Sequence, residues 1–194
     1  MVNRPVRVAA SLASLAAEDR DRYFGCLAAP RPARDPLAAL HLYDLKLAAV
    51  RAQSEERHPA LIKLAWWRDA VADLKAHEER GEPLLTFMSA VLPSGREERL
   101  AAIADTHMDR VEDGTGAADP VAFLAAAADV LSCNVSAEQL KAMAAGLAGR
   151  NKSAVRVPRA LRPVTAPLLA ARAGHRSPTR RQLGMLVHMA TGRI

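Results

Sequence analysis

Three carboxylates in the middle of the chain stand at a spacing that could bind a metal ion. Asp105, Asp109 and Asp113 follow one another at four-residue intervals. On a helix this spacing places side chains on one face, and carboxylate oxygens are ligands for divalent cations. The series also lies opposite an expected apolar stripe, so an acidic face turned to water is the simpler interpretation. Asp105 and Asp109 are weak metal-ligand candidates, and we expect no resident metal or cofactor.

A second motif is one glycine short of a phosphate-binding P-loop. It runs from Gly146 to Ser153, but a P-loop follows a strand and a helix is expected here, so a helix C-cap at Gly149 explains it better. None of the six histidines has a second histidine four residues away, and no serine or cysteine lies in a nucleophile motif. The sequence therefore indicates no catalytic residue.

Two charged residues fall on an otherwise apolar helical stripe, which also contains Leu37, Leu40 and Leu47. They are Asp44 and Arg51, and burying either without a partner would cost several kcal/mol. Seven residues apart on one helix they are about 10 Å distant, too far to pair with each other. Each should find a partner on a neighbouring helix, as part of a buried polar network or of a ligand pocket.

The elements that position these residues are expected to be helices. Ala, Leu and Arg dominate, and strand-forming aromatic residues are only 4% of the chain. Periodicity with start and stop signals predicts helices over about residues 6–27, 35–51, 59–74, 84–92, 95–113, 119–133, 137–149 and 178–190. We expect an all-α, single-domain helical bundle that does not span a membrane, since no apolar run approaches about 20 residues.

Local signals define several helix ends. Asp35 is expected to cap the second helix, and capping boxes are expected at Ser94 with Glu97 and at Ser136 with Gln139. His107 falls on the inner stripe of the fifth helix, where a hydrogen-bonded core histidine is the simplest interpretation. Prolines at 158, 163 and 167 are expected to interrupt the segment before the last helix, whose apolar residues are Leu183, Leu186, Val187 and Ala190.

Charge is distributed unevenly along the chain. The net charge is +6, yet all 21 acidic residues lie at or before Glu138. We expect a helical domain over residues 1–149 and a basic, proline-interrupted segment over residues 150–194 packed on the same domain. Such asymmetry favours an anionic partner. The candidate anion-binding residues are Arg150, Lys152, Arg156, Arg159, Arg162, Arg180 and Arg181.

Four short segments carry a resemblance to a known family. They are the run Asp19-Arg20-Asp21-Arg22-Tyr23, the pair Ala29-Pro30, the stretch from Leu42 to Arg51 and the stretch from Ile62 to Ala70, which contains Trp66-Trp67-Arg68. In this order and spacing the chain resembles the squalene/phytoene synthase family over residues 15–75. The match is closest to the divergent branch that includes the mitochondrial complex I assembly factor of that family.

The resemblance implies a truncated isoprenoid-synthase-like fold with a degenerate metal site. Active members bind diphosphate through Mg²⁺ held by two aspartate-rich motifs. If Tyr43 matches the aromatic residue before the first motif, that motif falls on Ala48, Ala49 and Ala52, and no acidic residue after Glu138 could form the second. The resemblance also suggests partners for the charged stripe, so the candidate pocket or polar-network residues are Tyr43, Asp44, Arg51, Lys63, Trp67, Arg68 and Asp69.

We therefore hypothesise a non-catalytic member of this family, acting as an assembly factor or scaffold, at a membrane surface through its basic segment. A protein partner is expected, an anionic membrane surface is a further partner, and the expected compartment is the bacterial cytoplasm or the mitochondrial matrix beside the inner membrane. An alternative is a prenyl-diphosphate transferase that is active only with a partner subunit. A second alternative is an RNA-binding helical protein, disfavoured because the basic segment lacks aromatic stacking residues.

Overall fold

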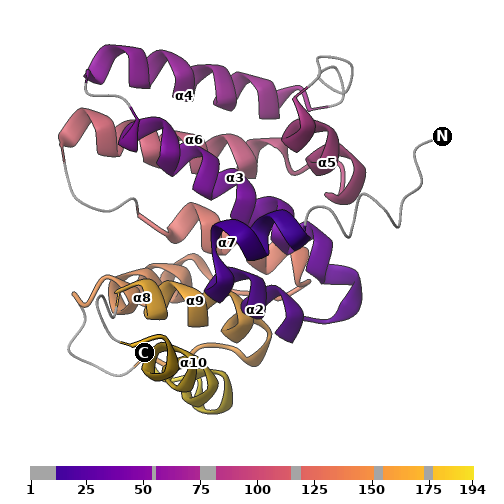
Figure 1. Cartoon of the computed structure of the whole chain (residues 1–194), viewed down its shortest axis with the longest axis vertical. Coiled ribbons are helices and arrows are strands. Elements are labelled where there is room, and N and C mark those ends of the chain that lie inside the picture. The colour runs from indigo at the N-terminus through magenta and orange to yellow at the C-terminus, as the bar shows by residue number, and fades with distance from the viewer. Residues whose placement is uncertain (1–11, 54–55, 75–81, 115–118, 151–154, 173–176) are drawn as a thin grey trace. The chain divides into compact units, whose positions relative to one another are not determined.

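A computed structural model describes residues 12–53, 56–74, 82–114, 119–150, 155–172 and 177–194 (Figure 1). Within these ranges the regular elements are all helices, which confirms the all-α fold class. Contacts between Cα atoms divide the chain into two units, residues 39–126 and residues 1–38 with 127–194. Below, these are the central unit and the terminal unit.

The central unit contains most of α3 (Arg34–Ala52), α4 (Arg57–Ala72), α5 (Pro83–Val91), α6 (Glu97–Asp113) and the start of α7 (Val121–Val130). Helices α4 and α6 run side by side along much of their length (Figure 1). The predicted inner stripes are buried here, with Leu64 and Trp67 on α4 and Leu100 and Ile103 on α6. Burial of these side chains supplies most of the stabilisation of such a unit.

The terminal unit contains a helical stretch over residues 12–18, α2 (Arg20–Ala28), α8 (Ala137–Leu147), α9 (Arg162–Arg172) and α10 (Pro178–Thr191). Two short 3₁₀ helices, η1 (Arg31–Ala33) and η2 (Arg159–Leu161), precede α3 and α9. Helix α9 packs against α2, α8 and α10. Near the C-terminus, Val155 exchanges two backbone hydrogen bonds with Ile194.

This division does not coincide with the boundary expected after residue 149. Residues 137–147 form α8, which packs on α9 in the basic segment. The residues just before and just after residue 149 consequently lie in the same unit. The change in charge along the sequence marks where acidic residues stop and does not mark a break in the packing.

Several predicted helix ends are wrong, because caps and turns begin or end the helices at other residues than predicted. The first helix is interrupted at Asp19, whose carboxylate accepts a hydrogen bond from the backbone N–H of Arg22 and so begins α2. Helix α3 begins one residue before Asp35, because η1 leads directly into it. Helix α7 ends at Val130 instead of Cys133, and Ser132 follows with a positive φ of 50°.

The two capping boxes have different outcomes. At α8 the box is formed: Ser136 Oγ accepts from the N–H of Gln139, and the Gln139 side chain accepts from the N–H of Ser136. At α6 the N-cap is Arg96, and no side chain caps it, so the box predicted at Ser94 is wrong. The predicted glycine stop at Gly149 is confirmed, since this residue has a φ of 71° just beyond α8.

Prolines do not interrupt α9 as predicted. Pro163 lies in its first turn, where no N–H is needed, and Pro167 lies inside the helix. Lacking an N–H, Pro167 cannot bond the carbonyl of Pro163, and that carbonyl faces Gly25 of α2 so closely that a Cβ there would collide with it. Gly25 therefore permits the close approach of α2 to α9.

Candidate functional site

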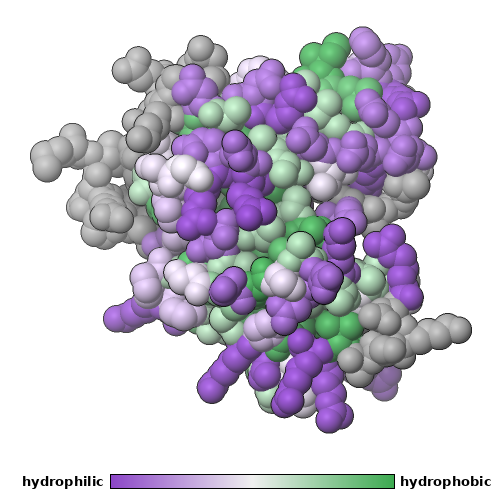
Figure 2. Space-filling model, turned by 180° about the vertical axis from the view of Figure 1, so that it is seen from behind, coloured by the Kyte–Doolittle hydropathy of each residue, from purple (hydrophilic) through white to green (hydrophobic). Residues whose placement is uncertain are grey.

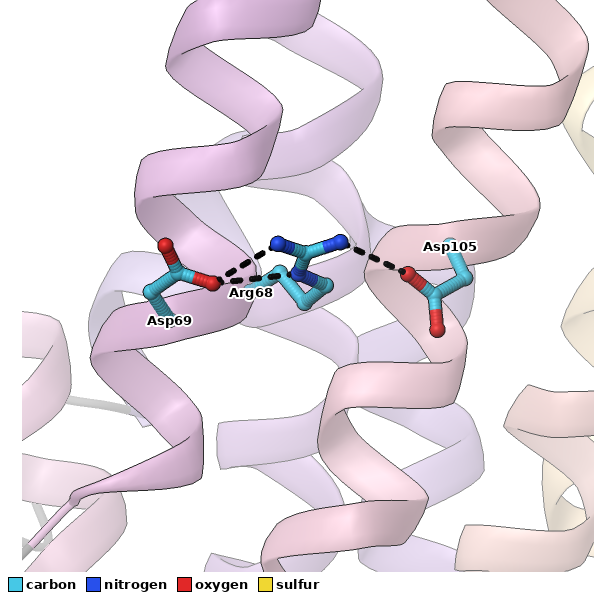
Figure 3. A network of polar contacts seen from close by, with 3 residues as sticks. All are labelled: Arg68, Asp69 and Asp105. Carbon is cyan, nitrogen blue, oxygen red and sulfur yellow. Dashed lines mark hydrogen bonds and ion pairs between the residues drawn. The ribbon is translucent and has the colours of Figure 1, made fainter.

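The predicted polar residues of α4 meet a carboxylate of α6 on the surface of the central unit (Figure 3). Arg68 donates through Nε and Nη2 to Oδ1 of Asp69, at 3.1 and 3.0 Å. Its Nη1 lies 3.9 Å from Oδ1 of Asp105. All three side chains are at least 40% exposed, so screening by water leaves each pair with little stabilising effect.

Asp44 of the α3 stripe pairs with His107, which the sequence predicts to be a core residue. Oδ1 of Asp44 lies 3.0 Å from Nε2 of His107 on α6, and both side chains are largely buried. His107 is not among the expected partners, which were Lys63, Arg68 and Asp69. The two residues are separated by 63 positions in sequence, and nothing local indicates their pairing.

An aromatic cluster fills the space between α3 and α4. The rings of Tyr43 and Trp67 meet edge to face with their centroids 6.0 Å apart, and the ammonium of Lys46 lies 5.8 Å from the Trp67 ring. Tyr43 is fully buried, and its hydroxyl has no hydrogen-bond partner among the described residues. Burial raises the pKa of Tyr43, and Asp105 and Asp44 raise it further.

The remaining predicted residues of this set are not all brought together. Lys63 is exposed on α4, and Asp109 is exposed on α6. The side chain of Arg51 lies outside the described part of the structure. Among the described residues there is no group of three side chains that could hold a metal ion.

Residues 15–96 match the family model of squalene/phytoene synthase. This part of the chain is therefore similar to the squalene/phytoene synthases. No curated protein and no solved structure matches the chain. The squalene/phytoene synthase match includes α3, α4 and α5, and so it covers the helices that carry the Asp44, Tyr43 and Trp67 contacts.

The squalene/phytoene synthase fold implies Mg²⁺, and the residues of this chain do not fit it. If Tyr43 matches the aromatic residue before the first metal-binding motif, that motif falls on Ala48, Ala49 and Ala52 of α3. Methyl groups offer no oxygen ligand to a hard cation. No step of a prenyl-transfer reaction can be derived through these positions.

The basic residues of the terminal unit have two kinds of surroundings. Arg150, Arg156 and Arg159 are exposed. Arg162 instead donates through Nη1 to the carbonyls of Met189 and Ala190, at 3.0 and 2.8 Å, where α10 ends. Lys152 lies outside the described residues.

Other arginines line a groove in the terminal unit. It has a volume of about 650 Å³ and runs between α9 and α10. Its lining includes Arg180 and Arg181, which are two of the candidate anion-binding residues, and also Arg172 and Arg193. The sequence does not predict a groove position for Arg172 and Arg193, since their proximity to Arg180 and Arg181 depends on the packing of α9 and on the C-terminal turn.

The apolar residues of α10 are arranged differently from a core-facing stripe. Leu183, Leu186 and Val187 are 61%, 59% and 54% exposed, whereas Met185 and His188 are buried. His188 bonds to the Thr165 hydroxyl at 2.7 Å through Nε2 and to the Arg193 carbonyl at 2.9 Å through Nδ1. Burial lowers the pKa of His188, and Arg162 lowers it further, while the bond to Arg193 opposes this shift.

No described helix has the length and the apolar character needed to cross a membrane.

Proposed function

We propose that this chain is a non-catalytic squalene/phytoene synthase-like protein that acts as an assembly factor or scaffold at a membrane surface. The observation that carries the proposal is the filled interior of α3, α4 and α6. Tyr43, Leu47, Leu64, Trp67 and Ile103 are each 5% exposed or less. A prenyl transferase needs an open pocket for two long apolar chains, and these side chains occupy the space beside the degenerate motif.

The resemblance supports the assembly role. The Trp66-Trp67-Arg68 segment is similar to the branch that includes the mitochondrial complex I assembly factor. Trp66, at 46% exposed, and Ile62, at 60%, lie four residues apart on α4 and offer a surface for a protein partner.

The charge of the terminal unit supports the membrane location. The arginines after residue 138 have no acidic neighbours in sequence, since no Asp or Glu follows Glu138. Attraction to an anionic membrane would be weakened by salt. Co-sedimentation with anionic vesicles should therefore fall from low to high salt, and equal binding to neutral vesicles would contradict the membrane location.

The absence of catalysis is tested with farnesyl and geranylgeranyl diphosphate plus Mg²⁺. We expect no condensation product from the purified chain. The Asp105→Asn and Asp109→Asn variants are the controls, because these carboxylates are the weak metal-ligand candidates. Turnover by the wild type that either variant abolishes would overturn the proposal.

The assembly role is tested by deleting the gene in its source organism and measuring the amount and activity of respiratory complex I. We expect a loss that is restored by the wild type and equally by Asp105→Asn. Normal complex I in the deletion strain would contradict the assembly role. Rescue by the wild type alone would favour a catalytic one.

A further inference from the structure

The groove between α9 and α10 combines an apolar floor with an array of positive charge. Its lining comprises Leu169, Ala170, Arg172, Arg180, Arg181, Gly184, Met185, Val187, His188, Thr191 and Arg193. The four arginines approach it from α9, from the first turn of α10 and from the chain end. No carboxylate is present among these lining residues.

The arginines of the groove differ in how they are held. Arg172 donates to the carbonyl of Gly146 at 2.9 Å, and Nε of Arg181 lies 3.6 Å from Oδ2 of Asp21. Neither Arg180 nor Arg193 forms an ion pair among the described residues. Two guanidinium groups are thus positioned by the fold and two remain available for an anion, for which their planar geometry suits phosphate oxygens.

An apolar stripe lies beside the groove on the same helix. At 100° per residue, Leu183, Leu186 and Val187 fall within one third of the circumference of α10. Val187 also lines the groove, so the stripe and the arginine array share an edge. Figure 2 shows one face of the molecule, on which hydrophobic side chains lie exposed between long hydrophilic ones.

We propose that α10 lies at the headgroup boundary of an anionic phospholipid bilayer, with a lipid phosphate in the α9/α10 groove and Leu183, Leu186 and Val187 among the acyl chains. This inference rests on the membrane part of the proposed function and names the residues and the lipid class. An interfacial helix needs exposed large apolar residues beside basic ones, and its binding increases with both.

The bilayer fits these features better than a second copy of the chain does. Packing two α10 helices through their exposed stripes would bring Arg180 and Arg193 against the same groups of the other copy, at a cost in like-charge repulsion. An acidic amphipathic helix of another protein would satisfy the same charges, and it is an outcome that the experiment must separate from the lipid.

The first test places a negative charge in the groove without disturbing the fold. A Cβ built on Gly184 meets no atom within 4 Å, so a longer side chain can be accommodated there. Binding of Gly184→Glu and of the matched neutral variant Gly184→Gln is measured by co-sedimentation with phosphatidylcholine vesicles that contain phosphatidylglycerol. We expect Gly184→Glu to bind about fivefold more weakly than Gly184→Gln, since one charge near such a surface contributes about 1 kcal/mol. Equal binding by the two variants would overturn the groove site.

The second test removes the apolar stripe. Leu183→Ser with Leu186→Ser should weaken binding at least about tenfold, because burial of large apolar side chains among the acyl chains drives the binding of an interfacial helix. The control is Ile62→Ser with Trp66→Ser, which removes the exposed apolar pair of α4 and should leave vesicle binding unchanged. The reverse ranking would assign the membrane contact to α4 and overturn this inference.

Two further arms identify the ligand. Inorganic phosphate at millimolar concentration should compete weakly with vesicles, because it lacks the acyl chains. Competition as strong as that of dispersed phosphatidylglycerol would make the site one for a free anion and overturn the bilayer assignment. The bilayer assignment would also be overturned if the Leu183→Ser with Leu186→Ser variant lost binding to an acidic amphipathic peptide but kept its binding to vesicles. If no variant changes vesicle binding but salt still does, this inference fails and the membrane location in the proposed function stands.

Discussion

The central and terminal units differ in how often their charged side chains pair with each other. In the central unit, Asp44 pairs with His107, Arg68 pairs with Asp69 and Asp105, and one arginine, Arg57, binds a helix-end carbonyl, that of Glu112. The terminal unit contains the ion pairs Arg22–Asp19 and Arg181–Asp21, but three of its arginines bind carbonyls at helix ends. Arg34 donates to Ala29 after α2, Arg172 to Gly146 in the last turn of α8, and Arg162 to Met189 and Ala190 in the last turn of α10.

The difference shows how an arginine-rich unit with few carboxylates can still fold. A helix C-terminus carries partial negative charge and unpaired carbonyls, so it can take the place of an acidic side chain. Such a bond orients the guanidinium without neutralising it. The positive charge of these three arginines therefore remains available to an anionic partner.

The largest expected effect tests whether the central interior is as closely packed as its contacts indicate. Trp67→Ala should lower the free energy of unfolding by about 3–5 kcal/mol, because a buried aromatic side chain is lost and a cavity remains. The adjacent, half-exposed Trp66 is the control, and Trp66→Ala should cost less than about 1 kcal/mol. Urea unfolding followed by the fluorescence of the remaining tryptophan measures both. Similar losses would show that the interior is not selectively packed around Trp67.

A second prediction concerns the largely buried Asp44–His107 pair of the central unit. Asp44→Ala should destabilise by about 1–3 kcal/mol, since His107 would lose its carboxylate partner in a buried position. Asp105→Ala breaks only an exposed pair and should cost no more than about 1 kcal/mol. In a double-mutant cycle, Asp44→Ala with His107→Phe should cost less than the sum of the single variants. Strict additivity would mean that the 3.0 Å contact contributes nothing.

Two glycines of the terminal unit should respond in opposite directions to the same substitution. Gly25→Ala should destabilise by about 1–3 kcal/mol, because its Cβ would meet the Pro163 carbonyl and push α2 from α9. Gly184→Ala should stabilise by about 0.5–1 kcal/mol, because it lies inside α10 in open space and alanine is the better helix former. Thermal unfolding by far-UV circular dichroism distinguishes them. A loss of stability in Gly184→Ala would contradict the open groove.

The smallest expected effect is a pH dependence of the terminal unit. The pKa of His188 is lowered in the folded state, mainly by burial, so the unfolded state takes up a proton more readily. Stability should therefore be unaffected above the ordinary histidine pKa of about 6.5 and should fall as the pH drops below it. Urea titrations across this range should show a weaker dependence for His188→Gln than for the wild type. An unchanged dependence would assign the effect to other groups.

Sequence signals succeeded where the determining atoms lie within a few residues of one another. The capping box at Ser136, the stop at Gly149 and the inner stripe that places His107 in the core all depend on local backbone geometry. Distant contacts gave no such signal. The Asp44 partner lies on another helix, and the Ser94 box failed because the chain begins α6 at Arg96 without a side-chain cap.

By itself the sequence determined the helical class, the similarity of residues 15–96 to squalene/phytoene synthases and the excess of positive charge after Glu138, because these follow from residue type and near spacing. Tertiary structure decided which face of α10 is buried, how Pro167 is accommodated in α9 and which arginines surround the groove. Each of these depends on what a neighbouring helix offers: the carbonyl that faces Gly25, the hydroxyl that binds His188 and the carbonyl that holds Arg172. Periodicity specifies that a helix has an apolar side, but only packing specifies which side it buries.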